Sequence, residues 1–252
     1  MADQKNNIGP STIKLSVIVP VFNEVENLEP LILEIQATLD NTFPYEMIFI
    51  DDCSTDGTLN KLIEFNRKVE TLRVLTHERR SGQSAAIRSG VQAAQAILVA
   101  TLDGDGQNDP SDIPNLLAAY EENVGTTKKI MICGQRAKRK DGFIKRFSSK
   151  IANGIRSSLL GDLTMDSGCG LKLFRVTDFM ELPSFDHMHR FLPALMIRSG
   201  GKVIPIMVSH RSRERGRSKY GVFDRLWVGI FDLFGMVWLR CRPINPEVEE
   251  PE

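Results

Sequence analysis

Two aspartates and a glutamine alternate with glycines directly after an apolar run. Asp103, Asp105 and Gln107 follow the run from Ala96 to Thr101, which has the composition of a buried parallel strand. The intervening glycines permit tight turns and the close approach of a ligand. Oxygen ligands at this spacing suit Mg²⁺ or Mn²⁺, cations that also bind substrate phosphates. An isolated Asp-x-Asp is more often a solvated turn, so the surrounding elements have to decide.

Those elements alternate between strand and helix through the first half of the chain. Apolar, β-branched runs predict strands over 14–21, 46–50, 72–75 and 96–101. Helical periodicity follows each of them, which predicts an α/β domain with a mostly parallel sheet flanked by helices, Rossmann-like in class. Because parallel strands end at one edge, three polar clusters are expected along it. They are Asn23/Glu24, Asp51/Asp52 and Asp103/Asp105.

The formal charge of zero hides a split between the two halves of the chain. Residues 1–125 carry 19 Asp/Glu and 9 Lys/Arg, and residues 126–252 carry 13 and 23. The neutral total argues against a nucleic-acid partner. An acidic half that holds a cation and a basic half that holds anions is one interpretation; two solvated surfaces of opposite sign is the other.

The cysteines and the N-terminus indicate the compartment. Cys53, Cys133, Cys169 and Cys241 are far apart and form no Cys-x-x-Cys pair, so neither a zinc site nor a disulfide framework is expected. The polar start lacks the apolar core of a signal peptide. No window reaches the roughly 18–20 apolar residues of a spanning helix. We therefore expect a reduced, cytoplasmic setting.

The second half has a different character. A basic loop is expected over 134–142, then a helix over 143–160, a Gly-rich turn and strand over 166–175, a helix over 191–199 and a strand over 202–208. A second basic stretch spans 210–220. No linker or repeat separates the halves, so we predict a flexible start at 1–13 and a single domain over 14–222.

The last helix, within 223–242, carries many aromatic residues, with Arg240 and Arg242 at its end. Charges at Arg225 and Asp232 interrupt it. This pattern suits an amphipathic helix lying in a membrane interface, and the alternative is a core helix packed on the sheet. The acidic, Pro-containing tail over 243–252 is predicted to be disordered.

Four motifs stand in order along the chain: Ser16–Glu24, Ile50–Gly57, Asp103–Gln107 and Arg213–Lys219. Together they resemble glycosyltransferase family 2, and more narrowly the polyprenyl-phosphate enzymes of the dolichyl-phosphate mannose synthase type. The resemblance extends over roughly residues 14–222. It implies a GT-A fold, a nucleotide-sugar donor and a divalent metal.

The resemblance also implies roles for the acidic half. Asp105 and Gln107 would hold Mg²⁺ or Mn²⁺, and Asp103 would assist the metal or bind a ribose hydroxyl. Base and ribose would be bound by Pro20, Asn23, Glu24 and either Asp51 or Asp52. A structural role competes at two positions, because Asp56 suits a helix cap and Asn23 could cap its own helix.

For the basic half, the resemblance implies that Arg136 and Arg146 bind the acceptor phosphate. Arg213, Ser218 and Lys219 would close over the donor and acceptor phosphates as a mobile loop. Asp166 would orient the arginines. The remaining cations of the first basic loop are assigned to the surface or to lipid headgroups; they are Lys138, Arg139 and Lys140. No role is assigned to His189-Arg190.

The acceptor follows from an absence in the sequence. A hydroxyl acceptor needs a general base, whereas a phosphate is already ionised near neutral pH. The second half has no Glu-Asp element of the kind that hydroxyl-directed relatives carry. We therefore predict inverting, in-line transfer of a hexose to a polyprenyl (dolichyl- or undecaprenyl-type) phosphate, with mannose, galacturonic acid or glucose open.

The expected location is the cytoplasmic face of a membrane, with peripheral attachment through the last helix or a membrane partner protein. Two alternatives remain open. One is a family 2 transferase acting on a saccharide hydroxyl, and the other is a non-catalytic protein that recruits a membrane partner.

Overall fold

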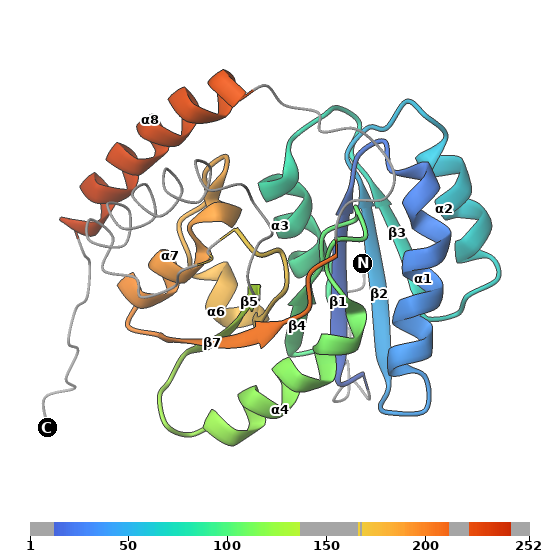
Figure 1. The fold of residues 1–252 in the computed structure, drawn as a ribbon, viewed down its shortest axis with the longest axis horizontal. Coiled ribbons are helices and arrows are strands. Elements are labelled where there is room, and N and C mark those ends of the chain that lie inside the picture. Colours follow the sequence, from blue (N-terminus) through green and yellow to red (C-terminus); the bar gives the residue numbers. More distant parts are fainter. Residues whose placement is uncertain (1–12, 137–165, 167, 212–221, 243–252) are drawn as a thin grey trace, which may run out of the picture.

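The fold is built on one twisted sheet (Figure 1). The computed structural model describes residues 13–136, 166, 168–211 and 222–242, and seven strands among them pair in the order β3-β2-β1-β4-β6-β5-β7. The strands are β1 Leu15–Val21, β2 Tyr45–Asp51, β3 Leu72–Thr76, β4 Leu98–Thr101, β5 Ile130–Arg136, β6 Lys172–Arg175 and β7 Lys202–Val208.

Helices cover both faces of this sheet. The α-helices are α1 Val25–Leu39, α2 Thr58–Asn66, α3 Gln83–Ala93, α4 Ile113–Asn123, α6 Val176–Met180, α7 Leu192–Arg198 and α8 Val222–Arg240. Two short 3-10 turns are η1 Pro110–Asp112 and η2 Met188–Arg190. The predicted α/β class, the mostly parallel sheet and the C-terminal helix are confirmed.

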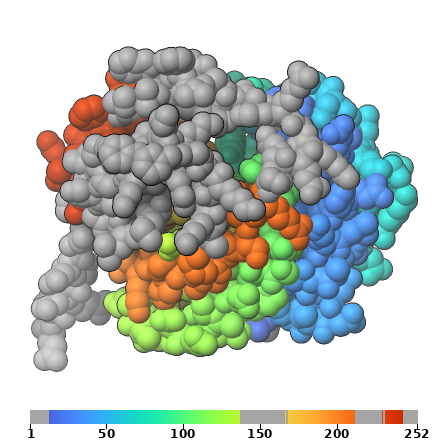
Figure 2. All heavy atoms as spheres, viewed as in Figure 1, coloured from blue at the N-terminus to red at the C-terminus, as the bar shows by residue number. Residues whose placement is uncertain are grey.

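Alternation along β1 explains the two layers. Val17 and Val19 belong to the apolar cluster that α1, α2 and α4 complete, whereas Ile18 belongs to the cluster of α3, α6 and α7. Side chains of successive strand residues point to opposite faces, so a wholly apolar strand feeds two cores. In the view of Figure 2, atoms of α4 lie next to those of β7, with α1 beside them.

Of the seven strands that the structure describes, β6 alone runs antiparallel to its neighbours, and it lies between β4 and β5. Its first residue, Lys172, is paired with Thr101 at the end of β4 and with Cys133 of β5. The chain therefore enters β6 at the edge where the parallel strands end. Residues that precede β6, such as Gly170, are brought to the same edge as Asp103.

One expectation about the second half was wrong. Gly134, Gln135 and Arg136 were assigned to a basic loop, but they continue β5, where they pair with Ile206 to Val208 of β7. β5 and β7 form seven residue pairs, and the last three of them extend β5 beyond its apolar part. Tertiary pairing thus outweighed the local polar composition.

α8 runs along the outside of the molecule, at the upper left of Figure 1. Met236 is 2% exposed and joins the cluster of α7, while Phe231, Phe234 and Trp238 are 72%, 72% and 62% exposed. Arg198 of α7 donates hydrogen bonds to backbone carbonyls near the helix end. α8 thus packs on the α7 layer with one side and presents aromatic rings on another. Among the described helices, none combines the length and apolar character needed to cross a bilayer.

Candidate functional site

The loop after β4 folds tightly against the end of β1. Asp103 N donates to Asn108 Oδ1 at 3.2 Å, and Gln107 N donates to Asp105 Oδ1 at 3.1 Å. At Gly104 a Cβ would lie 2.9 Å from the carbonyl oxygen of Pro20. A side chain there would collide with backbone, so this glycine is a steric requirement of the loop. We call Asp103–Gln107 the metal loop.

Asp103 is held from two sides within this loop. Gln83 Nε2, at the start of α3, donates to Asp103 Oδ1 at 2.9 Å. A Cβ on Gly170 would lie 2.2 Å from the Asp103 carboxyl group, so the glycine leaves the space that the carboxylate fills. Burial, followed by the charge of Asp105, raises the pKa of Asp103 to about 6, although Lys172 and Arg136 oppose the rise.

This arrangement fits a divalent cation. The structure holds two carboxylates close enough to repel each other, and Gln107 adds an amide to the same loop. The described residues contain no group of three or more His, Cys, Asp or Glu side chains placed to hold a metal. Mg²⁺ is commonly bound by one or two carboxylates together with substrate phosphates, so a site that the substrate completes agrees with this donor set.

Asp51 and Asp52, at the end of β2, have different surroundings. Asp52 accepts hydrogen bonds from His77 Nδ1 at 2.7 Å and from the backbone N–H groups of Ser81 and Gly82, both at 2.8 Å. Both of its oxygens are therefore used by the protein. Asp51 is 1% exposed, and its Oδ1 has no hydrogen-bond partner among the described residues. Of the pair, only Asp51 therefore has an oxygen that no described residue occupies.

The end of β1 lies beside these carboxylates. Asn23 has a φ of 54°, and its Oδ1 accepts from Thr55 N at 2.7 Å, so it fastens the loop after β2 and does not cap its own helix as one alternative held. Glu24 is nearly buried at 9% exposed. Asp56 accepts from Thr58 N, the first residue of α2, at 3.0 Å, although the N-cap position itself is taken by Gly57. Pro20 lies beside Gly104 through its carbonyl.

Arg136, the last residue of β5, lies close enough to Asp103 of the metal loop to interact with it electrostatically. It forms a bidentate ion pair. Its Nε and Nη2 donate to the two oxygens of Asp166 at 2.5 Å and 2.6 Å. The fixed fork of a guanidinium suits such bidentate pairing, which also fixes its orientation. The pKa of Arg136 is raised, chiefly by this hydrogen bonding. The expectation that Asp166 orients an arginine is therefore met for Arg136.

The chain after β7 docks on the metal loop. Arg211 N donates to Gln107 O at 3.0 Å, and the Arg211 guanidinium contacts Asp109 and Glu34, both at 2.7 Å. The second basic stretch therefore begins beside the metal loop. Several site predictions lie outside the described residues. They concern Arg146, Arg213, Ser218, Lys219, Lys138, Arg139 and Lys140.

Four contributors to the site were missed by sequence reasoning. Gln83 was expected only within the helical stretch that follows the strand 72–75, and Arg211 only as one residue of the second basic stretch. Gly170 and Lys172 were placed in a turn and a strand without a role. Lys172 is 3% exposed, donates to the Cys169 carbonyl and bears electrostatically on Asp103. A lysine inside an apolar strand is itself a usable signal, because buried ammonium groups need a partner.

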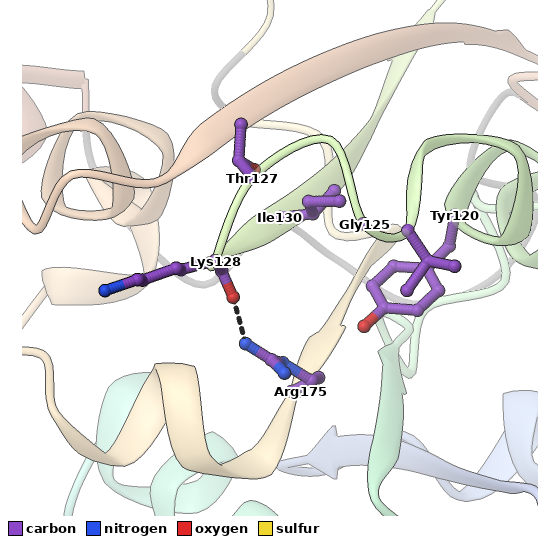
Figure 3. Close-up of a pocket in the computed structure, with 7 residues that line it drawn as sticks. Tyr120, Gly125, Thr127, Lys128, Ile130 and Arg175 are labelled. Atoms are coloured by element: carbon purple, nitrogen blue, oxygen red, sulfur yellow. Dashed lines mark hydrogen bonds between the residues drawn. The ribbon is translucent and has the colours of Figure 1, made fainter.

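A cavity of about 440 Å³ lies elsewhere and does not belong to this site (Figure 3). Tyr120, Ile130 and Arg175 help to line it. Ile130 begins β5 and Arg175 is paired with Leu98 at the start of β4, so this cavity lies at the amino ends of those strands. Ligands of open α/β sheets bind at the opposite edge.

The fold and the site define a GT-A glycosyltransferase. The chain belongs to glycosyl transferase family 2, whose sequence pattern matches residues 16–182.

All four cysteines are free thiols.

Two curated relatives are similar over most of the chain. The dodecaprenyl-phosphate galacturonate synthase of Rhizobium johnstonii is 34% identical over 241 residues, which cover 93% of this chain and 70% of that protein. The undecaprenyl-phosphate 4-deoxy-4-formamido-L-arabinose transferase of Photorhabdus laumondii is 34% identical over 226 residues, covering 87% and 66%. The chain thus spans about two thirds of the length of such relatives.

Among solved structures, the chain resembles glucosyl-3-phosphoglycerate synthase from Mycobacterium tuberculosis in complex with Mn²⁺, uridine diphosphate and phosphoglyceric acid. The TM-score is 0.67 at 19% identity, and the match covers 92% of this chain and 80% of that one. At this identity the likeness establishes the fold.

Proposed function

We propose that the protein transfers a hexose from a nucleotide-sugar donor to the phosphate of a polyprenyl lipid. The observation that carries the proposal is the coupled pair Asp103 and Asp105 at the end of β4, across the edge from the ion-paired Arg136. At this edge of the sheet the carboxylates offer negative charge to a cation, and Arg136 offers positive charge to anionic substrates. The two curated relatives, both named for sugar transfer to polyprenyl phosphates, support the acceptor class.

Mg²⁺ or Mn²⁺ would be held by Asp103, Asp105 and Gln107. Such an ion supplies positive charge where the departing nucleoside diphosphate develops negative charge. Gln83 and Gly170 keep the Asp103 carboxyl in place within the loop. The mycobacterial synthase was crystallised with Mn²⁺ and uridine diphosphate together, which favours this assignment.

The nucleotide would lie along the ends of β1 and β2. Pro20, Asn23, Glu24 and Asp51 are assigned to base and ribose, with the Asp51 Oδ1 as an acceptor for a base or sugar donor group. Asp52 is better explained as a scaffold, because its oxygens already accept three hydrogen bonds. The Arg80 guanidinium lies over the Phe22 ring, with its Cζ 4.2 Å from the ring centroid, and would border this end of the nucleotide site.

The acceptor phosphate would bind on the basic side. Arg136 presents a guanidinium oriented by Asp166, and Arg146, Arg213, Ser218 and Lys219 complete the phosphate contacts in this proposal. A phosphate monoester needs no general base. Its oxygen attacks the anomeric carbon in line with the departing diphosphate, which inverts the configuration.

The test is incubation with Mn²⁺, undecaprenyl phosphate and a panel of nucleotide sugars that includes galacturonic acid, glucose and mannose donors. We expect a lipid-linked monosaccharide and a free nucleoside diphosphate for at least one donor. Asp105→Ala is the matched control and should lose turnover while remaining folded, as a cooperative thermal unfolding transition would show. A glycan product formed without lipid would favour the hydroxyl-directed alternative. Unchanged cellular function of Asp105→Ala would favour the non-catalytic alternative.

We further propose peripheral attachment at the cytoplasmic face of a membrane through α8. Phe231, Phe234 and Trp238 share the exposed side of this helix, and Arg240 and Arg242 follow them. Aromatic rings flanked by arginines suit an interface containing anionic lipid. The variant with serine at the three aromatic positions should lose binding to phosphatidylglycerol vesicles. A variant with serine at Leu33, Ile63 and Ile97, apolar residues exposed elsewhere, should retain it. Equal binding by both would refute this attachment, and a membrane partner protein would then be required.

A further inference from the structure

Four consecutive residues, two before α3 and the first two of α3, connect three parts of the site. The backbone N–H groups of Ser81 and Gly82 donate to Asp52, and Gln83 donates to Asp103. Ser84 Oγ contacts His189 Nδ1 of η2 at 2.7 Å. We call Ser81–Ser84 the bridging segment. The bridging segment is thus in contact with the end of β2, with the metal loop and with η2.

His189 contacts this segment through two of its atoms. Its backbone N donates to Ser84 Oγ at 3.2 Å, in addition to the Nδ1 contact. Since Ser84 Oγ accepts from that N–H, its hydroxyl proton is available for Nδ1. We assign the ring as neutral and protonated at Nε2, so that Nδ1 accepts a hydrogen bond from the Ser84 hydroxyl.

The surroundings of His189 keep the ring neutral. Burial lowers its pKa to about 3, and the charges of Lys172, Arg190 and His187 contribute in the same direction. The segment η2 is itself held from the other side by α8, because His187 Nδ1 and Arg190 Nη1 lie 3.3 Å and 3.9 Å from Asp232 Oδ2. His189 thus reaches the bridging segment from a fixed support.

We propose that His189 is a positioning residue for the metal loop. By accepting a hydrogen bond from the Ser84 hydroxyl, His189 fixes the first turn of α3. This turn directs Gln83 Nε2 toward Asp103 Oδ1. The inference rests on the proposed function only in taking Asp103 as a metal ligand. Gln83 is the group one contact removed from the ligand, and such groups orient metal ligands and tune metal affinity; His189 acts through it. The His189-Arg190 motif acquires a role that the donor and acceptor sites do not give it.

The experiment measures Mn²⁺ binding in the presence of uridine diphosphate by the electron paramagnetic resonance of free Mn²⁺. His189→Leu should weaken binding about tenfold, the range seen when outer-shell partners are removed. His189→Asn should bind like the wild type, because its Oδ1 stands where Nδ1 stood and can accept the Ser84 proton. The backbone contact of residue 189 survives in both variants, so a purely structural role would not separate them.

A double-mutant cycle adds the decisive control. If His189 acts through Gln83, His189→Leu combined with Gln83→Ala should bind Mn²⁺ no more weakly than Gln83→Ala alone. Fully additive losses, or wild-type affinity of His189→Leu, would overturn the proposal. If His189→Leu does not fold, His189→Gln replaces it, because the longer side chain cannot place an acceptor at the Nδ1 position.

The outcomes also separate this inference from the proposed function. Normal Mn²⁺ binding with non-additive losses, but no lipid-linked product from any donor, would refute the acceptor assignment and leave the role of His189 standing. A wild-type protein that binds no Mn²⁺ would overturn the role of His189 together with the metal loop.

Discussion

Carboxylates end both β2 and β4, yet the protein treats them in opposite ways. Asp52 receives three hydrogen bonds from His77, Ser81 and Gly82. Among the described residues, Gln83 donates a side-chain hydrogen bond to Asp103, and burial, followed by the charge of Asp105, raises the pKa of Asp103 to about 6. The hydrogen-bonding capacity of Asp52 is thus filled by the protein, whereas Asp103 is repelled by a neighbouring carboxylate.

This difference separates scaffold from site. A carboxylate whose acceptor capacity is filled by backbone N–H groups fixes the loops around it and has little left for a ligand. Two neighbouring carboxylates that repel each other cost stability, and a cation removes that cost. Strain of this kind is informative about function when, as here, it lies at the ligand-binding edge of the sheet.

The largest expected effect is at Asp103. Its pKa is about 6 in the folded protein against the ordinary 3.8, so between these values the folded state keeps a proton that the unfolded chain releases. Stability therefore falls as the pH rises through this window. Asp103→Asn removes the penalty and should unfold at higher urea, with a gain of up to about 3 kcal/mol at pH 8 that shrinks toward pH 4.

The same Asp103→Asn variant should lose turnover by about 100-fold, since an amide is a weaker ligand than a carboxylate. Urea unfolding at two pH values, together with a turnover assay, measures both effects. A variant that is less stable than the wild type at pH 8 would contradict the assignment of repulsion to this residue.

Asp52 should respond in the opposite direction. Asp52→Asn replaces one acceptor oxygen by an amide that faces donors, and we expect a loss of about 2–3 kcal/mol in unfolding free energy. Asp51→Asn is the matched control: Ser54 N can still donate to its remaining oxygen, so stability should change by less than about 1 kcal/mol. Nucleotide affinity, measured by calorimetry, should fall in Asp51→Asn. Equal stability losses would erase the distinction between the two residues.

Much of this comparison follows from the sequence. The apolar runs before Asp51 and Asp103 are long and β-branched, so both strands, their parallel pairing and the shared edge were predictable. The metal loop was recognised for the same reason. What distinguishes Asp51 from Asp52 was not predictable, because the donors to Asp52 come from a loop after a different strand.

The second half was less accessible to sequence reasoning. A strand was expected within 166–175, but β6 has only four residues and inserts antiparallel between β4 and β5. No periodic pattern in the sequence predicts that length or those neighbours. Its position brings Gly170 and Lys172 to Asp103. Likewise, the contact between His189 and Ser84 spans 105 positions along the chain, so no local pattern records it.

The smallest expected effect concerns the space beside the carboxylate. Gly170→Ala would place a Cβ 2.2 Å from the Asp103 carboxyl, whereas in Gly168→Ala the nearest atom would lie at an ordinary 3.7 Å. We expect Gly170→Ala to weaken Mn²⁺ binding about tenfold, as a disturbance of a ligand's support does. Gly168→Ala should bind like the wild type in the same titration. The reverse order would show that Gly170 does not shape the metal loop.

The most direct test of the central claim is Mn²⁺ binding by the metal loop itself. Free Mn²⁺ is titrated with wild-type protein and with Asp105→Asn, with and without uridine diphosphate. The account predicts that uridine diphosphate tightens binding to the wild type and that the folded Asp105→Asn variant binds at least about 10-fold more weakly. Equal Mn²⁺ affinity of the two proteins, in the presence of the nucleotide, would contradict it.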